Sequence, residues 1–358
     1  MKLKYIFVHG AGGWGHYDPI NRYVPYWGML GPNLLTYLNS NGFESYAASV
    51  APARSIWIRA CELYAQLSGS RVDYGRVHSE REGIARFGRD FSQEPLIPEW
   101  NEDTRLVLLG HSMGGATVRL LAHLLVYGDP EEREQTPADQ LTPLFAGGIH
   151  KRVFGIVTLA APTNGVSAPD MFTDPAFDLE KIRIPVWSRA AMKILSLRLG
   201  SARTRRTAND VQRVSGIDRA LAQNETIATL PDVYYFCAAC SCTEKQPDGS
   251  HCPVPSKTEF LYYARSIQMG AYTGVTPEGF VIDDTWREND GLVNTVSARA
   301  PIGAPQKALD PAHIEKGIWN ILPDFDGDHM SLQGGFFHRV DVRGYYLNLL
   351  NMIQSLPE

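Results

Sequence analysis

The chain has 358 residues, of which 44% are hydrophobic and 20% are charged, a composition typical of folded globular proteins and not of disordered ones. Its formal net charge of −5 and its pI near 6.1 give no overall reason to expect a nucleic-acid partner. Apolar runs stay short of the ~18 residues that span a bilayer, and the first residues become strand-like too early for a signal peptide. We therefore expect neither a transmembrane helix nor a signal peptide.

Up to residue 161, short apolar strands alternate with amphipathic helices, which predicts an α/β fold with a mostly parallel central sheet and helices on both faces. The strand expected at 153–161 is almost wholly apolar, as is typical of a parallel sheet buried on both faces. The acidic segment 129–134 predicts the solvated start of a helix. The other elements predicted in this half are a strand at 4–9, a helix at 31–41, a strand at 45–50, a helix at 56–67, a loop-rich stretch to 100, and a strand and helix over 104–127.

Residues 165–230 interrupt this alternation. From Lys181 to Arg206 there are eight basic residues and no acidic one, and apolar residues recur there at helical spacing. This pattern predicts a lid or cap insertion whose basic amphipathic helix meets an interface. A surface helix with a solvated basic face is the competing interpretation. Beyond the insertion we expect a strand near 280–282 and a closing helix at 341–355, so that residues 1–358 form a single domain.

A Gly-x-Ser-x-Gly motif, Gly110-His111-Ser112-Met113-Gly114, separates the apolar run 106–109 from a helix-like pattern. A serine between a strand and a helix is held exposed on a sharp turn, where it acts as a nucleophile. Glycines on either side suit a turn that packs closely against its neighbours. The motif by itself is also compatible with an ordinary glycine loop, but its context favours Ser112 as a nucleophile.

The glycine-rich loop 10–15 follows the first predicted strand and reads literally as Gly-x-Gly-x-x-Gly. A dinucleotide site would need a helix that begins within these glycines and an acidic residue after the next strand. Prolines at 19, 25 and 32 interrupt any long helix, and no acidic residue ends the strand at 45–50. We therefore interpret the loop as an oxyanion hole, in which the backbone N–H groups of Ala11 and Met113 are the donors.

A serine nucleophile needs a histidine base and a carboxylate that orients it, and in this fold both follow the serine. Downstream of Ser112 there are six histidines, at positions 123, 150, 251, 313, 329 and 338. His329 best fits a loop between the last strand and the last helix. Position alone leaves the acid open among Asp283, Asp284, Glu288 and Asp290.

Four cysteines lie within 16 positions: Cys237, Cys240, Cys242 and Cys252. We expect a local disulfide that joins Cys252 to Cys240 or Cys242 across the turn at 247–249. Free buried thiols and a zinc site are the alternatives. The zinc alternative is disfavoured because residues 234–239 read as a strand, on which Cys237 and Cys240 point to opposite faces.

Short motifs spread along the chain match a single protein family. They are Val8-His9-Gly10, Gly13-Trp14-Gly15, Tyr26-Trp27-Gly28, 59–67, 72–75, 85–89, Pro143-Leu144-Phe145, 288–291, 316–320 and Asp328-His329. With them the chain resembles the thermoalkaliphilic Geobacillus-type and staphylococcal bacterial lipases, which have the α/β-hydrolase fold. The resemblance covers nearly the whole length except residues 180–215.

This resemblance implies that Ser112, Asp290 and His329 form the catalytic triad, with Ala11 and Met113 at the oxyanion hole. It thereby favours Asp290 over the other candidate acids. Family members also hold a zinc ion with two Asp and two His. Of the three ligand positions that can be placed, only His78 is kept, because Ile58 and Ile84 offer no lone pair. The fourth would lie in lid sequence that this shorter insertion does not contain.

The family's calcium ligands after the catalytic histidine correspond to Ser331 and Phe336, which are not carboxylates. We therefore predict that both metals are lost and that the chain needs no cofactor. An acidic run, Asp324-Phe325-Asp326-Gly327-Asp328, is either a plain acidic loop or a calcium site of its own.

These observations predict a serine carboxylic-ester hydrolase, a lipase or esterase, that acts on ester or lipid substrates, with a lipid–water interface as a further contact. We expect no nucleic-acid partner and no stable protein partner. The resemblance implies a secreted enzyme of lipid degradation, and a cytoplasmic one is the alternative. The competing functions are a polyester hydrolase on the same triad, acyl transfer to alcohols, and a non-catalytic lipid-binding protein on this fold.

Overall fold

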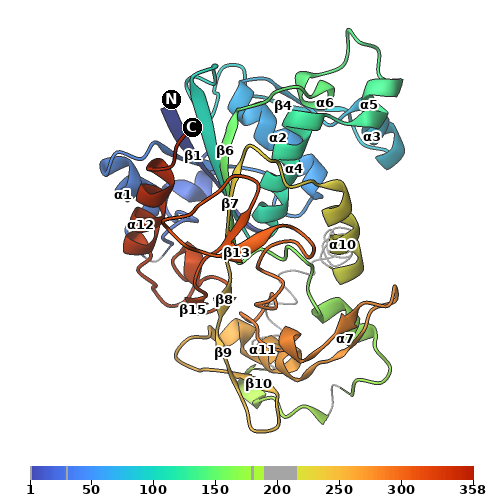
Figure 1. The fold of residues 1–358 in the computed structure, drawn as a ribbon, viewed down its shortest axis with the longest axis vertical. Helices are drawn as coiled ribbons and strands as arrows, with labels where there is room; N and C mark the ends of the chain where they lie inside the picture. Colours follow the sequence, from blue (N-terminus) through green and yellow to red (C-terminus); the bar gives the residue numbers. More distant parts are fainter. Residues whose placement is uncertain (1, 30, 179–180, 189–215) are drawn as a thin grey trace.

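The computed structural model describes residues 2–29, 31–178, 181–188 and 216–358, and a seven-stranded parallel sheet runs through its centre (Figure 1). The strands lie in the order β13-β14-β7-β6-β5-β1-β2, and every neighbouring pair is parallel. Their bounds are β1 Lys2–Val8, β2 Ser45–Ala48, β5 Thr104–His111, β6 Val153–Leu159, β7 Tyr234–Ala238, β13 Gln306–Ala308 and β14 Trp319–Ile321. The predicted parallel α/β sheet is confirmed.

Helices cover both faces of the sheet, as predicted. On one face α2 (Ile56–Ser68) and α4 (Met113–Tyr127) pack over β5 and β6, and on the other α1 (Leu34–Ser40) and α12 (Arg343–Gln354) pack over β1 (Figure 1). All seven residues of β6 are buried, which explains its unbroken apolar sequence. Each face thus has its own apolar core, and together the two cores fix the sheet on which the functional loops are mounted.

The stretch predicted as loop-rich before residue 100 contains regular elements. A small antiparallel pair, β3 (Arg71–Asp73) and β4 (Phe87–Asp90), encloses α3 (Arg76–Glu82). The acidic segment that follows α4 forms α5 (Pro130–Gln135), but one of its residues is not solvated. Glu132 is 2% exposed because its carboxylate accepts hydrogen bonds from the backbone N–H groups of Arg76 and His78 at 3.0 and 2.9 Å. A carboxylate of this acidic segment therefore caps the N-terminus of α3, which the sequence pattern did not indicate.

The later elements gather at the end of the sheet opposite the N-terminus (Figure 1). The strand predicted near 280–282 exists as β12 (Val281–Ile282), but it pairs only with β11 (Gly274–Val275) and lies outside the central sheet. The last two sheet strands, β13 and β14, have three residues each and were not predicted. The other elements here are β8 Cys240–Ser241, β9 Thr243–Lys245, β10 His251–Pro253, α11 Phe260–Ala271, η3 Asp284–Trp286, β15 Phe325–Asp326 and η4 Ser331–Gln333.

The insertion 165–230 is described at its two ends, as α7 (Ala168–Thr173) and α10 (Ile217–Thr226). Most of the basic amphipathic helix predicted within 181–206 lies outside the described residues. In the part of the chain that the structure describes, no helix is long and apolar enough to cross a membrane.

All five cysteines are free thiols, so the predicted local disulfide is wrong. Cys240 and Cys242 are buried, and the Cys242 sulfur contacts the Ser266 hydroxyl at 3.8 Å instead of turning toward Cys252. Cys252 is half-buried on β10, where it pairs with Glu244 of β9. The turn between β9 and β10 is thus closed by backbone pairing without a covalent link, and free thiols are the correct alternative.

Candidate active site

Ser112 lies on a sharp turn between β5 and α4, with φ 53° and ψ −127°. An L-residue rarely adopts a positive φ, and such strain persists only where the surroundings fix the backbone. Here the Ser112 N–H donates to the Leu159 carbonyl at 2.9 Å, which ties the turn to the end of β6. The predicted strand–turn–helix context of the serine is confirmed.

The glycines beside the serine are required by close backbone approaches. A Cβ on Gly110 would lie 2.3 Å from the Gly114 carbonyl oxygen, and a Cβ on Gly114 would lie 2.3 Å from that of Val8. Both distances are far below van der Waals contact and involve backbone atoms, which do not move aside easily. The Gly-x-Ser-x-Gly spacing is thus a packing requirement of the turn against the start of α4 and against β1.

His329 and Asp290 form a buried hydrogen-bonded pair, in which His329 Nδ1 lies 2.8 Å from Asp290 Oδ2. The two residues are 3% and 1% exposed. Since a carboxylate only accepts, Nδ1 donates the proton of this bond, and Nε2 is the nitrogen that the neutral ring offers as a base. Backbone N–H groups of Leu292 and Val293 donate to Asp290 Oδ1 at 2.9 and 2.7 Å, which fixes the carboxylate.

The other candidate acids and histidines lie elsewhere. Asp283 and Asp284 are exposed, and His313 pairs with Asp310 at the surface. Asp290 lies in a turn after η3. The His329 loop lies between β15 and α12, as predicted.

The loop after β1 is packed directly against the serine. A Cβ on Gly10 would lie 2.8 Å from Ser112 Cβ, so only glycine allows this approach. Ala11 follows as an exposed residue, and Met113, 7% exposed, begins α4. The two predicted oxyanion residues therefore come from the ends of neighbouring parallel strands, because β1 pairs with β5 with Val8 opposite Gly110.

A buried arginine that the sequence analysis did not single out holds this loop. Arg59 of α2 is 0% exposed and donates to the His9 carbonyl, to the Ala51 carbonyl at 2.8 Å, and to the Thr117 hydroxyl at 3.0 Å. Burial lowers its pKa to about 10, so the guanidinium stays charged at neutral pH. In the sequence, a charged residue among the apolar positions of the 56–67 helix could have indicated this buried arginine.

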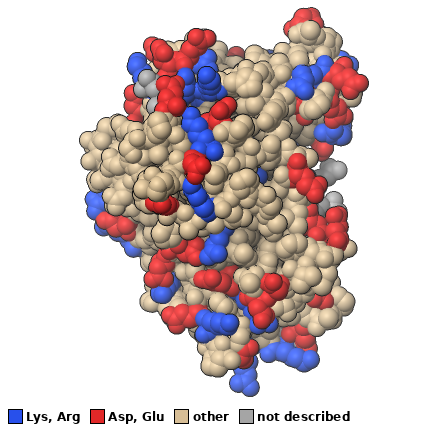
Figure 2. Space-filling view, viewed as in Figure 1, with Lys and Arg blue, Asp and Glu red and all other residues tan. Residues whose placement is uncertain are grey.

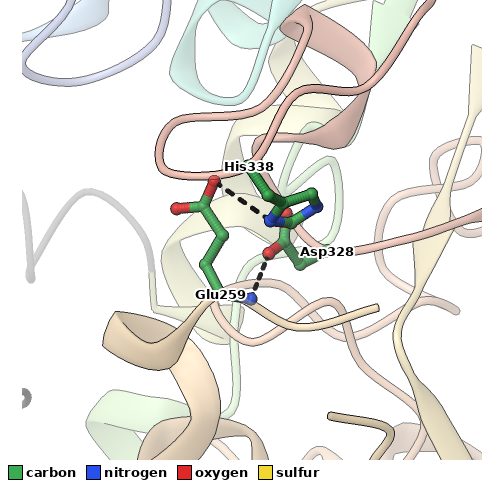
Figure 3. A group of neighbouring side chains, drawn as sticks. All are labelled: Glu259, Asp328 and His338. Atoms are coloured by element: carbon green, nitrogen blue, oxygen red, sulfur yellow. Dashed lines mark hydrogen bonds and ion pairs between the residues drawn. The ribbon is translucent and has the colours of Figure 1, made fainter. Parts of the chain in front are cut away.

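The loop that carries His329 is held by a second cluster, formed by Glu259, Asp328 and His338 (Figure 3). Asp328 accepts hydrogen bonds from the N–H groups of Glu259 and Met330 at 2.7 and 3.0 Å and from the Ser331 hydroxyl at 3.1 Å. One oxygen of Glu259, Oε1, accepts from the N–H groups of residues 336 and 337 and lies 3.6 Å from His338 Nδ1.

These three side chains have donor atoms within 4.8 Å of one another, a spacing that a metal ion could bridge. Three of the four carboxylate oxygens, however, already accept hydrogen bonds from the chain, and only Glu259 Oε2 is buried without a partner. These hydrogen bonds by themselves explain why the three side chains lie together, since they hold the loop in place. Burial raises the pKa of both carboxyl groups, and the charge of Asp328 raises that of Glu259 further.

The acidic run before His329 does not converge on one point. Asp324 pairs with Arg299 at 2.7 Å, and Asp326 pairs with Lys257 at 2.9 Å. Asp328 instead turns into the cluster with Glu259. Of the two interpretations of this run, the structure therefore supports the plain acidic loop.

At the positions where the resemblance implies zinc ligands, aromatic packing is found. Trp57 stacks on the ring of His78 at 4.8 Å and on Phe145 at 5.3 Å. Ile58 is buried in the core beside them. His78 is thus a packing residue here, and burial lowers its pKa.

On the face shown in Figure 2, basic and acidic side chains are interspersed, with uncharged surface between them. Such a pattern gives no extended field of one sign on this face.

The seven-stranded parallel sheet with helices on both faces places the protein in the α/β-hydrolase class. A family model described as "Lipase-like, C-terminal domain" matches residues 2–187, and the chain belongs to this lipase family. It is 32% identical to a Staphylococcus epidermidis lipase over 92% of its own length and 49% of that protein. The expected resemblance to staphylococcal lipases is therefore confirmed.

Solved structures agree. The chain superposes on EstA from Clostridium botulinum with a TM-score of 0.81 at 27% identity, covering 99% of this chain and 87% of that one. Lipase 1 from Pelosinus fermentans matches with a TM-score of 0.77 at 31% identity, covering 99% of both chains. The chain spans about half the length of the curated relatives it matches.

Proposed function

We propose that the protein is a serine carboxylic-ester hydrolase, a lipase or esterase. The observation that carries this proposal is the buried His329–Asp290 pair, whose histidine ring lies 4.9 Å from that of His111, the residue before the strained Ser112. Membership of the lipase family and the names of its relatives support the same chemistry.

In the proposed mechanism, Ser112 Oγ attacks the ester carbonyl carbon while His329 Nε2 takes the serine proton. Asp290 keeps the proton on Nδ1 and stabilises the imidazolium that forms. The N–H groups of Ala11 and Met113 donate to the oxyanion. His329 then gives its proton to the leaving alcohol, and water, activated by the same nitrogen, releases the acid from the acyl-enzyme.

Replacement of the serine tests this mechanism. Ser112→Ala should lower kcat for p-nitrophenyl butyrate by more than about 10⁴-fold, since the nucleophile is lost. Fluorophosphonate labelling should disappear with it, while the melting temperature stays close to that of the wild type. Retained turnover would contradict the triad, and a wild type that neither hydrolyses esters nor takes the label would favour a binding protein.

We also propose that residues 165–230 form the lid over this site and that the protein meets a lipid–water interface there. Apolar side chains of the described part of this segment support the proposal, because Phe172, Val186 and Trp187 are 44%, 83% and 54% exposed. Rates on butyrate to oleate esters, above and below micelle formation, test it. A rate that does not rise with micelles would contradict the interfacial contact.

A further inference from the structure

A continuous line of hydrogen bonds connects the three loops of the candidate active site. The Gly10 N–H donates to the Tyr26 hydroxyl at 3.2 Å, and this hydroxyl lies 2.7 Å from His111 Nδ1. On the other side of the ring, His111 Nε2 lies 2.8 Å from the His329 carbonyl oxygen. The line therefore begins beside Ala11, passes the residue before Ser112, and ends on the catalytic histidine's own backbone.

The direction of each bond follows from the atoms involved. A carbonyl oxygen only accepts, so His111 Nε2 must carry the proton. Burial and the neighbouring His329 lower the pKa of His111 to about 3, so the ring is neutral and its Nδ1 is an acceptor. Tyr26 therefore donates its hydroxyl proton to Nδ1 and accepts from Gly10. Every donor and acceptor on the line has a partner of the opposite kind.

We infer that Tyr26 and His111 are positioning residues, which set the distance between the oxyanion loop, the nucleophile turn and His329. This inference rests on the proposed function. Tyr26 and His111 are 2% and 1% exposed, and their polar atoms are all used within the line, so they act without touching substrate. An error of about 1 Å in such geometry costs about 100-fold in rate, which is why a fixed link matters.

The neutral state of His111 has a consequence of its own. Its ring centroid lies 4.9 Å from that of His329, which becomes a cation during the reaction. A charged ring at this distance would oppose that protonation. Burial of His111 therefore keeps a positive charge away from the general base while both hydrogen bonds of the ring remain.

Tyr26→Phe removes only the hydroxyl group. We expect kcat for p-nitrophenyl butyrate to fall about 10- to 100-fold with KM within about twofold, since substrate contacts are kept and transition-state geometry is lost. Tyr5→Phe is the matched control. Tyr5 lies on β1, is 2% exposed, and has a hydroxyl without a hydrogen-bond partner, so kcat should not change.

A double-mutant cycle separates positioning from general destabilisation. If the line acts as a unit, Tyr26→Phe added to His111→Leu should slow the enzyme no further than His111→Leu alone. His111→Gln, whose amide keeps a donor for the His329 carbonyl, should recover most of the turnover. An unchanged kcat in Tyr26→Phe, or losses that multiply in the double variant, would overturn the inference.

The failure of the proposed function is recognisable separately. It would appear as a wild type without esterase activity or a Ser112→Ala variant that keeps it. The inference fails only where the wild type is active, Ser112→Ala is inactive, and the Tyr26 and His111 variants behave as independent or neutral changes.

Discussion

The loop after β1 and the loop that carries His329 are both fixed by buried ionisable side chains, but these side chains have opposite charges. Arg59 donates to the His9 carbonyl at the start of the first loop. Glu259 and Asp328 instead accept from N–H groups of the second loop. The sign of the buried charge depends on the backbone, because a loop whose carbonyls point inward needs donors and a loop whose N–H groups point inward needs acceptors.

The two supports also differ in how well their charges are compensated. Arg59 has the carboxylate of Glu62 near enough to favour its charged form. In the second cluster two carboxylates face each other, and His338, which is 40% exposed at its side chain, is the neighbouring base. The stability of the loop that carries His329 should therefore change at mildly acidic pH, while that of the loop after β1 should not.

The largest effect is expected from Arg59→Met, which leaves the His9 and Ala51 carbonyls without a donor. Each unsatisfied buried group costs about 1–3 kcal/mol, so we expect a loss of about 3 kcal/mol in the free energy of unfolding and a kcat lower by about 100-fold. Urea denaturation and ester kinetics measure both. Arg119→Met is the control: Arg119 is also buried and donates to Asn224, so stability should fall while kcat stays. Equal kinetics in the two variants would contradict a specific role of Arg59 in holding the loop after β1.

An intermediate effect is expected from Glu259→Ala, which removes the acceptor for the N–H groups of residues 336 and 337. We expect a loss of about 2 kcal/mol in the free energy of unfolding, since two part-buried backbone donors lose their partner. Turnover should fall about 10-fold because the His329 loop loosens. Glu259→Gln keeps an acceptor oxygen and should retain most of both, and a glutamine variant as damaged as the alanine variant would argue against the hydrogen bonds as the cause.

The smallest effect concerns pH. Burial raises the pKa of Glu259 and Asp328, so near their titration the folded state binds more protons than the unfolded state. Their stabilisation is complete below the unfolded pKa and is lost as pH rises through the folded pKa. Glu259→Gln should therefore gain stability relative to the wild type as pH rises from about 4 to about 8. Thermal melts across this range measure the difference.

Asp341→Asn supplies a control without a slope over this range. The Arg343 side chain lowers the pKa of the exposed Asp341, so its stabilisation is complete above the unfolded value of about 3.9 and is lost only as pH falls through the folded value. The stability difference between this variant and the wild type should therefore stay nearly constant from about pH 4 to about pH 8, while that of Glu259→Gln changes. Parallel shifts in the two variants would contradict the assignment of the pH effect to burial.

Several elements could be predicted because the information for them is local. The β5–Ser112–α4 unit follows from a short apolar run, two glycines and a helical pattern that are contiguous in sequence. The β6 strand follows from its unbroken apolar run. In contrast, β13 and β14 have three residues each and are strands only because β14 pairs with β7 and β13 pairs in turn with β14.

The candidate active site likewise has parts that the sequence indicated and parts that it did not. The spacing of residues indicated Ser112, and the place of His329 before the last helix indicated the histidine, but position alone left four acids open. Asp290 is the one whose carboxylate the structure joins to His329, through a turn closed by the N–H groups of Leu292 and Val293. No local pattern distinguishes that turn from its acidic neighbours.

By itself, the sequence determined the α/β class, the serine turn and the glycines that it requires, because each depends on steric rules acting between residues close together in the chain. Only the tertiary structure decided what holds the loops around Ser112. Arg59, Tyr26, His111 and Glu259 stabilise them through contacts 16 to 218 residues apart. The buried surroundings that set their protonation exist only once the sheet and its helices have packed.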